Sequence, residues 1–267
     1  MLPNLGIIAG SGDLPREIAR LYTSRGGQCF IAALEGEFIA DDIGHVKFPI
    51  GAAGAILDYF NKSEVKNIII IGGINRPNLR AIKVDLEGAA LIAKIFRKKI
   101  LGDDNVLRLI SEYLEDKGFC VISPREVLLL NDYNNLITSR KSPSKQNIID
   151  INIGKQVLAS LGNVDVGQSV IVCNGYVLGI EAAEGTDNLI IRCKLLRRMS
   201  GGGVLVKMKK KGQDDRLDIP VIGPKTINLL AENNFDGLAI EKDGVIIINP
   251  SETNESLREN SLFLQLI

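Results

Sequence analysis

The residues with the clearest capacity for chemistry lie in one stretch, between Gly201 and Pro220. A glycine triplet opens an apolar run that is typical of a buried strand over Val204–Met208. The end of this run and the loop after it carry the charged side chains Lys207, Lys209, Lys210, Lys211, Asp214, Asp215, Arg216 and Asp218. Lysine and arginine bind phosphate oxygens, whereas carboxylates bind a divalent metal or activate a water, so the stretch indicates phosphate chemistry. Its composition is equally compatible with a solvated charged loop between two elements.

The composition narrows the classes of protein that can carry such a loop. The 267 residues include 32 basic and 32 acidic side chains, whereas nucleic-acid-binding proteins usually have a basic excess. The single histidine, His45, leaves no His-based metal centre and almost no room for a Ser-His-Asp triad. The four cysteines are scattered without Cys-x-x-Cys spacing, which favours reduced core thiols over a zinc site or disulfides.

Neither a signal peptide nor a membrane span is predicted. The N-terminus, Met1-Leu2-Pro3-Asn4, lacks a basic segment followed by a long apolar run. No uninterrupted apolar run approaches the roughly 20 residues that are needed to span a bilayer. We therefore expect a cytoplasmic protein. Contact with a membrane surface stays open, because such contact needs no spanning segment.

The first half of the chain alternates apolar runs with helical patterns. Strands are expected over Leu5–Ala9, Gln28–Leu34, His45–Phe48, Asn67–Ile71 and Phe119–Ile122, and helices over Arg16–Arg25, Gly51–Asn61, Leu86–Ile100 and Asn105–Lys117. This alternation implies a mostly parallel sheet with helices on both faces. The fold class is therefore α/β, with a Rossmann-like domain over residues 1–133.

The turn after the first strand, Gly10-Ser11-Gly12, could bind an anion. It lies between a strand and a helix, an arrangement that aims backbone N–H groups and a helix N-terminus at a negative charge. The third glycine of the dinucleotide-binding fingerprint is absent, so a plain tight turn is equally compatible with the sequence.

The second half begins after a change in composition. The helical and strand periodicity is lost from Asn131, and we predict a linker over 134–147, which is rich in Asn, Ser, Lys and Pro. Residues 148–267 are predicted to form an α+β domain. Its expected elements are a helix over 148–161, a hairpin of Ser169–Cys173 with Tyr176–Glu181 across Asn174-Gly175, a helix over 185–198, the strand at 204–208, a helix after Pro224, and a second hairpin of Leu238–Glu241 with Val245–Ile248.

Two further polar clusters flank the first predicted hairpin. Asp165-Val166-Gly167-Gln168 precedes it, and the segment from Glu181 to Asp187 follows it. Together with the charged loop they place many carboxylates at the ends of strands, where loops from different elements can converge. Taken singly, Asp187 and Asp104 are equally well explained as helix caps.

These motifs, taken in chain order, resemble the LpxI-type UDP-2,3-diacylglucosamine pyrophosphatases of lipid A biosynthesis. The motifs that carry the resemblance are Ile8-Ala9-Gly10-Ser11-Gly12-Asp13-Leu14-Pro15, Gly102-Asp103-Asp104, Asp165-Val166-Gly167-Gln168, Glu181-Ala182-Ala183-Glu184-Gly185-Thr186-Asp187, Gly203-Val204-Leu205-Val206-Lys207 and Gln213-Asp214-Asp215-Arg216-Leu217-Asp218-Ile219-Pro220. They extend over nearly the whole chain. The predicted linker and the tail from Ser251 match least.

The resemblance implies a magnesium-dependent hydrolase. It would cleave the pyrophosphate of UDP-2,3-diacylglucosamine into UMP and 2,3-diacylglucosamine 1-phosphate (lipid X). It would be a homodimer that contacts the inner face of the Gram-negative inner membrane only peripherally. The residues are compatible with this activity, because a pyrophosphate requires cations for its charge, and magnesium typically takes only one or two protein carboxylates.

Roles for individual residues follow from this activity. We expect one of Asp214 and Asp218 to be indispensable, because carboxylates four residues apart can face one site if the loop turns at Arg216. Arg216 and Lys207 would neutralise the charge that grows on the phosphates. The residues assigned to substrate binding are Gly10, Ser11, Gly12, Asp104, Gln168, Thr186 and Gln213, and the candidate metal ligands are Asp214, Asp218, Glu184 and Asp187.

Two other functions could use the same residues. A non-catalytic nucleotide- or lipid-binding regulator would need the Gly10-Ser11-Gly12 turn but no hydrolytic group. A dinucleotide-dependent oxidoreductase is disfavoured by the incomplete glycine fingerprint. Release of UMP from the substrate distinguishes the hydrolase from both.

Overall fold

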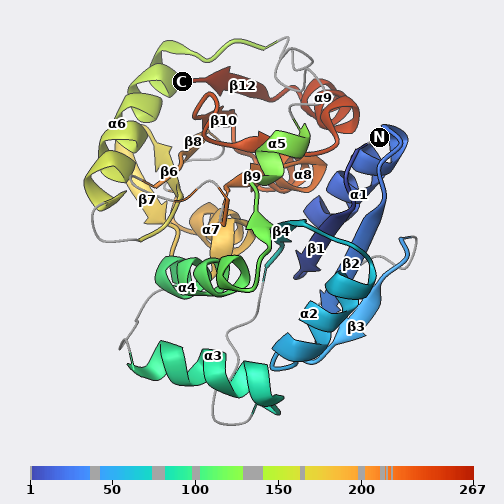
Figure 1. Ribbon diagram of the computed structural model, residues 1–267. Coiled ribbons are helices and arrows are strands. Elements are labelled where there is room, and N and C mark those ends of the chain that lie inside the picture. The colour runs from blue at the N-terminus through green and yellow to red at the C-terminus, as the bar shows by residue number, and fades with distance from the viewer. Residues whose placement is uncertain are drawn as a thin grey trace. The chain divides into compact units, whose positions relative to one another are not determined.

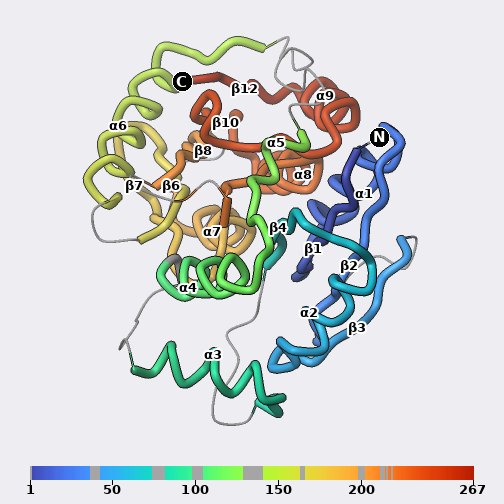
Figure 2. The backbone as a smooth tube through the Cα atoms, in the orientation of Figure 1, coloured from blue at the N-terminus to red at the C-terminus, as the bar shows by residue number. Residues whose placement is uncertain are grey.

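The computed structural model describes residues 2–36, 43–73, 82–97, 103–128, 141–162, 166–197, 202–210, 214, 216–217 and 219–267 (Figure 1), with only the backbone for 103 and 104. The path of the chain is followed most easily in Figure 2. The chain forms two compact units. The first consists of 1–131 together with 214–218, and the second of 132–213 together with 219–267. A short piece from the second half of the sequence therefore belongs to the first unit.

The first unit is built on an all-parallel sheet. Across the sheet the strands are β3 (Val46–Phe48), β2 (Cys29–Leu34), β1 (Leu5–Ala9), β4 (Asn67–Ile71) and β5 (Cys120–Val121). The helices are α1 (Leu14–Ser24), α2 (Ala53–Lys62), α3 (Leu86–Arg97), α4 (Asp103–Asp116) and α5 (Pro124–Leu128). The predicted α/β class and the five predicted strands are confirmed. Helix α5 was not predicted, because five residues are too few to show helical periodicity.

Alternating residues of these strands form the core. One face of the sheet packs against α2 and α4, with Phe60 and Leu114 meeting Ile68 and Ile70 of β4. Leu217, from the piece at 214–218, is buried in the same cluster. Helices α1 and α5 contact each other, and they contact β2 and β4 respectively. The isoleucine-rich runs are therefore buried strands, as expected for a sheet with helices on both faces.

The strand order reverses between β1 and β4, which are neighbours although they are distant in the sequence. Their carboxyl ends are joined through the backbone. Ser11 N donates to Gly73 O at 2.7 Å, and Gly73 N donates to Ser11 O at 2.9 Å. A Cβ at Gly10 would lie 2.2 Å from Gly73 O. Ligands of open α/β sheets bind at such a reversal point, and glycine is required here because the two chain segments approach so closely.

Replacing Gly10 by alanine is expected to destabilise the protein by about 1–3 kcal/mol, because the added methyl group meets a backbone carbonyl rather than a movable side chain. Equilibrium unfolding in urea measures the effect. Gly44→Ala is the matched control, since a Cβ there meets no atom within 4 Å. Equal stability of the two variants would show that the contact between β1 and β4 is less rigid than the structure indicates.

The second unit contains a mixed sheet between helices. Its strands lie in the order β12 (Phe263–Leu266), β10 (Gly237–Ile240), β8 (Val204–Lys207), β6 (Ser169–Cys173) and β7 (Tyr176–Ile180). A separate parallel pair consists of β9 (Val221–Ile222) and β11 (Ile246–Ile247). The helices are α6 (Lys145–Leu161), α7 (Gly185–Lys194), α8 (Pro224–Glu232) and α9 (Pro250–Glu259). Helix α6 packs on one face of the sheet, and α7, α8 and α9 supply core residues to the other.

The hairpin predicted across Asn174-Gly175 is confirmed. Strands β6 and β7 pair antiparallel, and both turn residues have positive φ, 51° for Asn174 and 81° for Gly175. The predicted hairpin of Leu238–Glu241 with Val245–Ile248 is wrong. Strand β10 instead lies parallel between β8 and β12, and β11 leaves to pair with β9. A run in which all four residues are buried is typical of a central parallel strand rather than of a hairpin edge.

The helix predicted to start at residue 148 begins earlier. Ser144 caps α6 by accepting a hydrogen bond from Asn147 N, and Asn147 Oδ1 accepts one from Ser144 N. Lys145, Gln146 and Asn147, which were predicted as linker, are therefore helical. This reciprocal cap satisfies two N–H groups that a helix start otherwise leaves unpaired. The tail forms α9 and β12, which were not predicted. Within the described residues, no helix is long and apolar enough to cross a membrane.

Candidate functional site

A buried lysine marks one edge of the sheet in the second unit. Lys207 is the last residue of β8, and it is only 6% exposed. Its Nζ donates a hydrogen bond to Thr186 Oγ1 at 2.9 Å. Taking an ammonium group out of water is costly unless polar partners surround it. The edge of the sheet must therefore be built to hold a positive charge.

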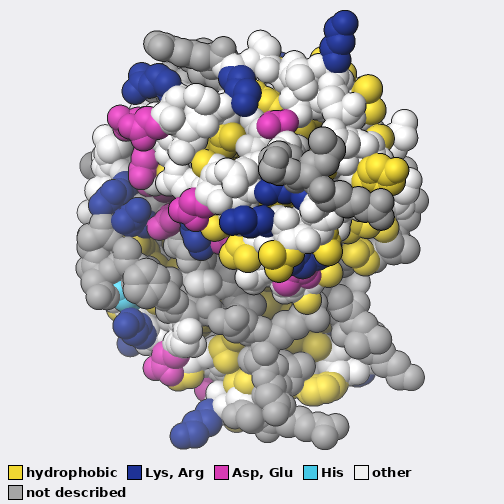
Figure 3. Space-filling model, turned by 180° about the vertical axis from the view of Figure 1, so that it is seen from behind, with side chains coloured by type: hydrophobic (Ala, Val, Ile, Leu, Met, Phe, Trp, Pro, Cys, Tyr) yellow, Lys and Arg dark blue, Asp and Glu magenta, His cyan; other side chains and the backbone are white. Residues whose placement is uncertain are grey.

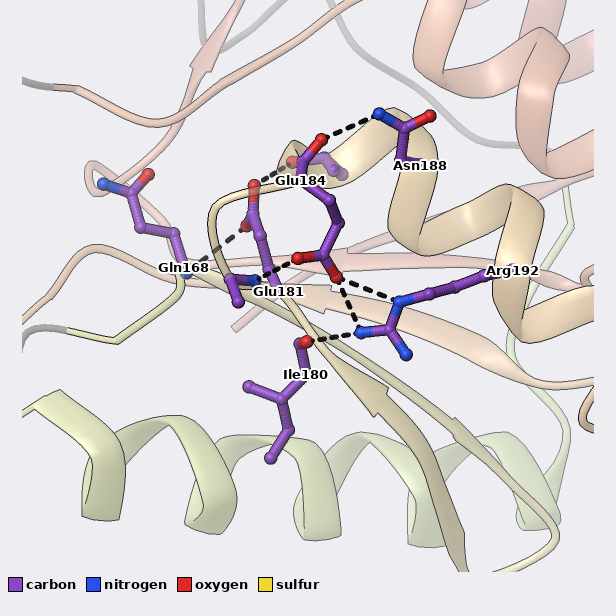
Figure 4. Close-up of polar contacts among 8 residues, drawn as sticks. Gln168, Ile180, Glu181, Glu184, Asn188 and Arg192 are labelled. Carbon is purple, nitrogen blue, oxygen red and sulfur yellow. Dashed lines mark hydrogen bonds and ion pairs between the residues drawn. The ribbon is translucent and has the colours of Figure 1, made fainter. Parts of the chain in front are cut away.

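The partners of Lys207 continue as a connected group. Thr186 Oγ1 donates to Glu181 Oε1 at 2.9 Å, and Ser169 Oγ lies 3.3 Å from Thr186 Oγ1. Glu181 Oε2 accepts a hydrogen bond from Gln168 N at 3.3 Å (Figure 4). We call Gln168, Ser169, Glu181, Thr186 and Lys207 the lysine cluster.

The topology explains why these residues meet. In the β6–β8 ladder, Ser169 lies opposite Lys207. Glu181 directly follows β7, and Thr186 lies in the first turn of α7. The sequence assigned Lys207, Thr186 and Gln168 to the site, and the structure brings these three residues together. It gave Glu181 and Ser169 no role. The β6–β8 register places Ser169 opposite Lys207, and the hydrogen bond from Thr186 connects Glu181 to the group.

Two helix N-termini belong to the same region of the second unit. Asp187, in the first turn of α7, forms an ion pair with Lys225 in the first turn of α8, with Nζ and Oδ2 2.6 Å apart. The N-cap of α8 is Gly223, which has no side chain to occupy the N–H groups of the first turn. Helix N-termini carry partial positive charge and favour anions. Together with Lys207, they make this edge suitable for phosphate groups.

Glu184, at the start of α7, forms an ion pair with Arg192 in the last turn of the same helix. Its Oε1 accepts hydrogen bonds from Arg192 Nε at 2.9 Å and from Arg192 NH2 at 2.7 Å (Figure 4). Arg192 also donates to Ile180 O at 2.7 Å. The backbone N–H of Glu184 itself, followed by Arg192, lowers the pKa of the Glu184 carboxyl below its ordinary value. Glu184 is therefore an ionised carboxylate whose charge is already matched by an arginine.

The described part of the charged loop belongs to the first unit. Asp214 and Arg216 form a two-point ion pair, with Arg216 NH2 2.8 Å from Asp214 Oδ2 and Nε 3.0 Å from Oδ1. Arg216 NH1 also contacts Glu115 Oε1 of α4 at 2.7 Å. The chain turns at Arg216, the condition for Asp214 and Asp218 to face one site, since Leu217 N donates to Asp214 O at 3.0 Å.

This arrangement fixes the charge of both partners. The hydrogen bond from Arg216 is the main cause that lowers the pKa of the Asp214 carboxyl. The same contact raises the pKa of Arg216. A carboxylate with a lowered pKa is a weak proton acceptor, although it still orients a water molecule or a cation. Asp214 is thus better suited to positioning than to general-base catalysis.

The remaining predicted site residues are placed as follows. Gly10 and Ser11 lie at the reversal point of the first unit, where Gly10 N donates to Ile71 O at 2.8 Å and Ser11 N to Gly73 O. These two N–H groups are thus used within the protein, and Gly12, with a φ of 105°, continues the turn. Asp104 lies in the first turn of α4, but its side chain is not described. Gln213, Asp215 and Asp218 lie outside the described residues.

A preformed metal cage is absent from the part of the chain that the structure describes, where no three His, Cys, Asp or Glu side chains gather. Each described candidate ligand has a cationic partner: Asp214 pairs with Arg216, Glu184 with Arg192 and Asp187 with Lys225. Oxygen donors of this kind suit magnesium, which usually binds through one or two carboxylates plus substrate phosphates. Taken singly, each of these carboxylates would suit magnesium only together with a phosphate ligand.

The fold and the site define a class: a two-unit α/β protein with a Rossmann-like parallel sheet and a second unit whose sheet edge is suited to phosphate groups. Residues 4–129 match the family described as the LpxI N-terminal domain, and residues 134–265 match the LpxI C-terminal domain. The chain belongs to the LpxI family. A relative from Caulobacter vibrioides, named UDP-2,3-diacylglucosamine pyrophosphatase LpxI, is 28% identical over 278 residues, which cover 97% of this chain and 96% of the relative.

Proposed function

We propose that this protein hydrolyses the pyrophosphate of UDP-2,3-diacylglucosamine to UMP and 2,3-diacylglucosamine 1-phosphate, a step of lipid A biosynthesis. The observation that carries the proposal is the buried Lys207, held by Thr186 and Glu181 at the start of α7. It occurs in a chain that matches the LpxI family in both halves. A fixed positive charge beside a helix N-terminus is the environment that a transferring phosphoryl group requires.

The reaction is a displacement at phosphorus. Water forms a new P–O bond, the bridging P–O bond breaks, and the water loses a proton as the second phosphate departs. Lys207 neutralises charge on the phosphate oxygens, and Thr186 and Glu181 keep its ammonium group in place. Because Arg216 neutralises Asp214, that carboxylate positions a partner rather than removing the proton.

We further propose that the reaction depends on magnesium. When bound, the metal supplies positive charge that polarises a phosphoryl oxygen. Asp214, Asp218, Glu184 and Asp187 remain the candidate ligands, with the pyrophosphate supplying further oxygens. We also expect the protein to be cytoplasmic, to be a homodimer, and to contact the inner membrane peripherally.

Incubation of the purified protein with detergent-dispersed UDP-2,3-diacylglucosamine tests the proposal, with UMP measured by chromatography. We expect UMP in the presence of magnesium, and a loss of at least about 100-fold in rate with EDTA that added magnesium restores. UDP-N-acetylglucosamine, which lacks the two acyl chains, is the control substrate.

The outcomes separate the parts of the proposal. Absence of UMP with retention of the lipid substrate on the protein would favour the non-catalytic binding protein. UMP release at an unchanged rate in EDTA would remove the magnesium dependence and leave the hydrolase.

A further inference from the structure

Helix α3 of the first unit is apolar on both sides. Its inward side includes the buried Gly88 and Ile95, whereas Leu86 and Phe96 are 92% and 57% exposed. At 3.6 residues per turn, the exposed positions fall within one arc of about 120°. These positions are Leu86, Ala89, Ala90, Ala93, Phe96 and Arg97, which we call the outer face of α3. An exposed apolar patch on a helix often marks a surface that binds another molecule.

Among the described residues, basic side chains lie on and next to the outer face. No carboxylate lies on it, and Arg97 and the nearby Lys83 are exposed. Glu87, at its border, is held by Lys117 at 2.7 Å and by Tyr113. Asp85 accepts hydrogen bonds from Gly88 N at 2.7 Å and from Ala55 N. The nearest carboxylates are therefore occupied by contacts within the first unit, and the apolar surface has a basic end.

We propose that the outer face of α3 docks on an anionic lipid bilayer. The inference rests on the proposed function, since a diacylated substrate is drawn from a membrane. An apolar arc with basic residues and no acidic ones is the pattern of a helix that lies in the interface between water and lipid. Helix α3 lies at the bottom of Figure 1. Figure 3, seen from behind, shows hydrophobic side chains at the surface near the bottom of its view.

A second copy of the chain is the less suitable occupant. A 12-residue helix is only about 18 Å long, so one face of it offers far less than the roughly 800 Å² per partner of a stable protein interface. A bilayer needs no complementary shape, and it accepts Leu86 and Phe96 together with the smaller alanines between them.

Flotation with lipid vesicles tests the proposal on the full-length protein. The probes are vesicles of phosphatidylcholine with and without phosphatidylglycerol. We expect Leu86→Ser with Phe96→Ser to lower the bound fraction about tenfold or more, and Arg97→Gln to weaken binding only to the anionic vesicles. Leu195→Ser is the matched control, because Leu195 is 82% exposed on the second unit. Its binding should stay within about twofold of wild type.

Hydrolysis of detergent-dispersed substrate does not require docking on a bilayer. The α3 variants should therefore release UMP at the wild-type rate in that assay. The proposal is overturned if the α3 variants float with vesicles like wild type. It is also overturned if wild type hydrolyses substrate but binds no vesicles, or if Leu195→Ser loses vesicle binding instead of the α3 variants. A change of oligomeric state in the α3 variants would assign the face to a second copy and also overturn it. Vesicle binding that depends on α3 in a protein without hydrolysis would leave docking intact and refute the proposed function.

Discussion

Replacing Lys207 by methionine is expected to lower the turnover of UDP-2,3-diacylglucosamine by about 10²–10³-fold, the usual loss when one fixed donor to a developing phosphate or oxyanion charge is removed. Methionine fills a similar volume, so the buried edge of β8 should keep its packing. The substitution also leaves Thr186 without the hydrogen bond that Lys207 donates, so some loss of stability is expected as well. Steady-state kinetics and urea unfolding on the same preparation separate the two effects, and the folded variant should show the loss of turnover.

The control is Lys209→Met, two residues further along, which keeps the backbone N–H that donates to Glu241 Oε2. It should change turnover by no more than about threefold. Thr186→Val provides an independent test, because it removes the hydroxyl that joins Lys207 to Glu181 but retains the lysine. Thr186→Ser should restore most of the loss. Near-normal turnover of both Lys207→Met and Thr186→Val would remove the lysine cluster from the reaction.

Replacing Arg216 by alanine is expected to lower turnover about 10²-fold, because in the proposed reaction the guanidinium would neutralise charge on the phosphates, and it also holds Asp214. Arg216→Lys should recover only part of the rate, since lysine cannot form the two-point contact with a carboxylate. If the arginine acts in the transition state, the turnover number falls and retention of the substrate changes little.

Glu115→Gln is the matched control, because it weakens the contact of Arg216 with α4 and leaves the pair with Asp214 in place. Its rate should stay within about threefold of wild type. Asp214→Ala and Asp218→Ala, made separately, then assign the carboxylate role. If both retain near-normal turnover, Glu184 with Asp187 becomes the better pair.

Local sequence signals predicted the parts of the fold that depend on neighbouring residues. The apolar run Asn67–Ile71 ends in two glycines and forms a strand over that range, and Asn174-Gly175 closes a hairpin because both residues tolerate positive φ. The run at Leu238–Ile240 was paired with the wrong partner. Its position between β8 and β12 depends on the tail at 263–266, which shows no strong pattern of its own.

The candidate site likewise contains residues that local signals indicated and residues that only the fold brings together. The sequence indicated Lys207, Thr186 and Gln168 by residue type, and a resemblance grouped them. The approach of Ser169 to Lys207 comes from the register of β6 against β8, which no local pattern encodes. The charged loop was assigned to the second domain by its position in the chain. Its place in the first unit is decided by the burial of Leu217 and by the contact of Arg216 with Glu115.

Segment 214–218 completes the first unit only late in the synthesis of the chain. A ribosome releases the strands β1 to β5 long before it reaches Leu217, so the newborn first unit lacks one of its core side chains until much of the later chain has been synthesised. A gene fragment that stops at residue 131 would encode every strand of that sheet and still yield an incomplete interior. The first half of the sequence therefore depends on a residue of the second half to complete its core, and it is not a self-sufficient module that recombination could transplant alone.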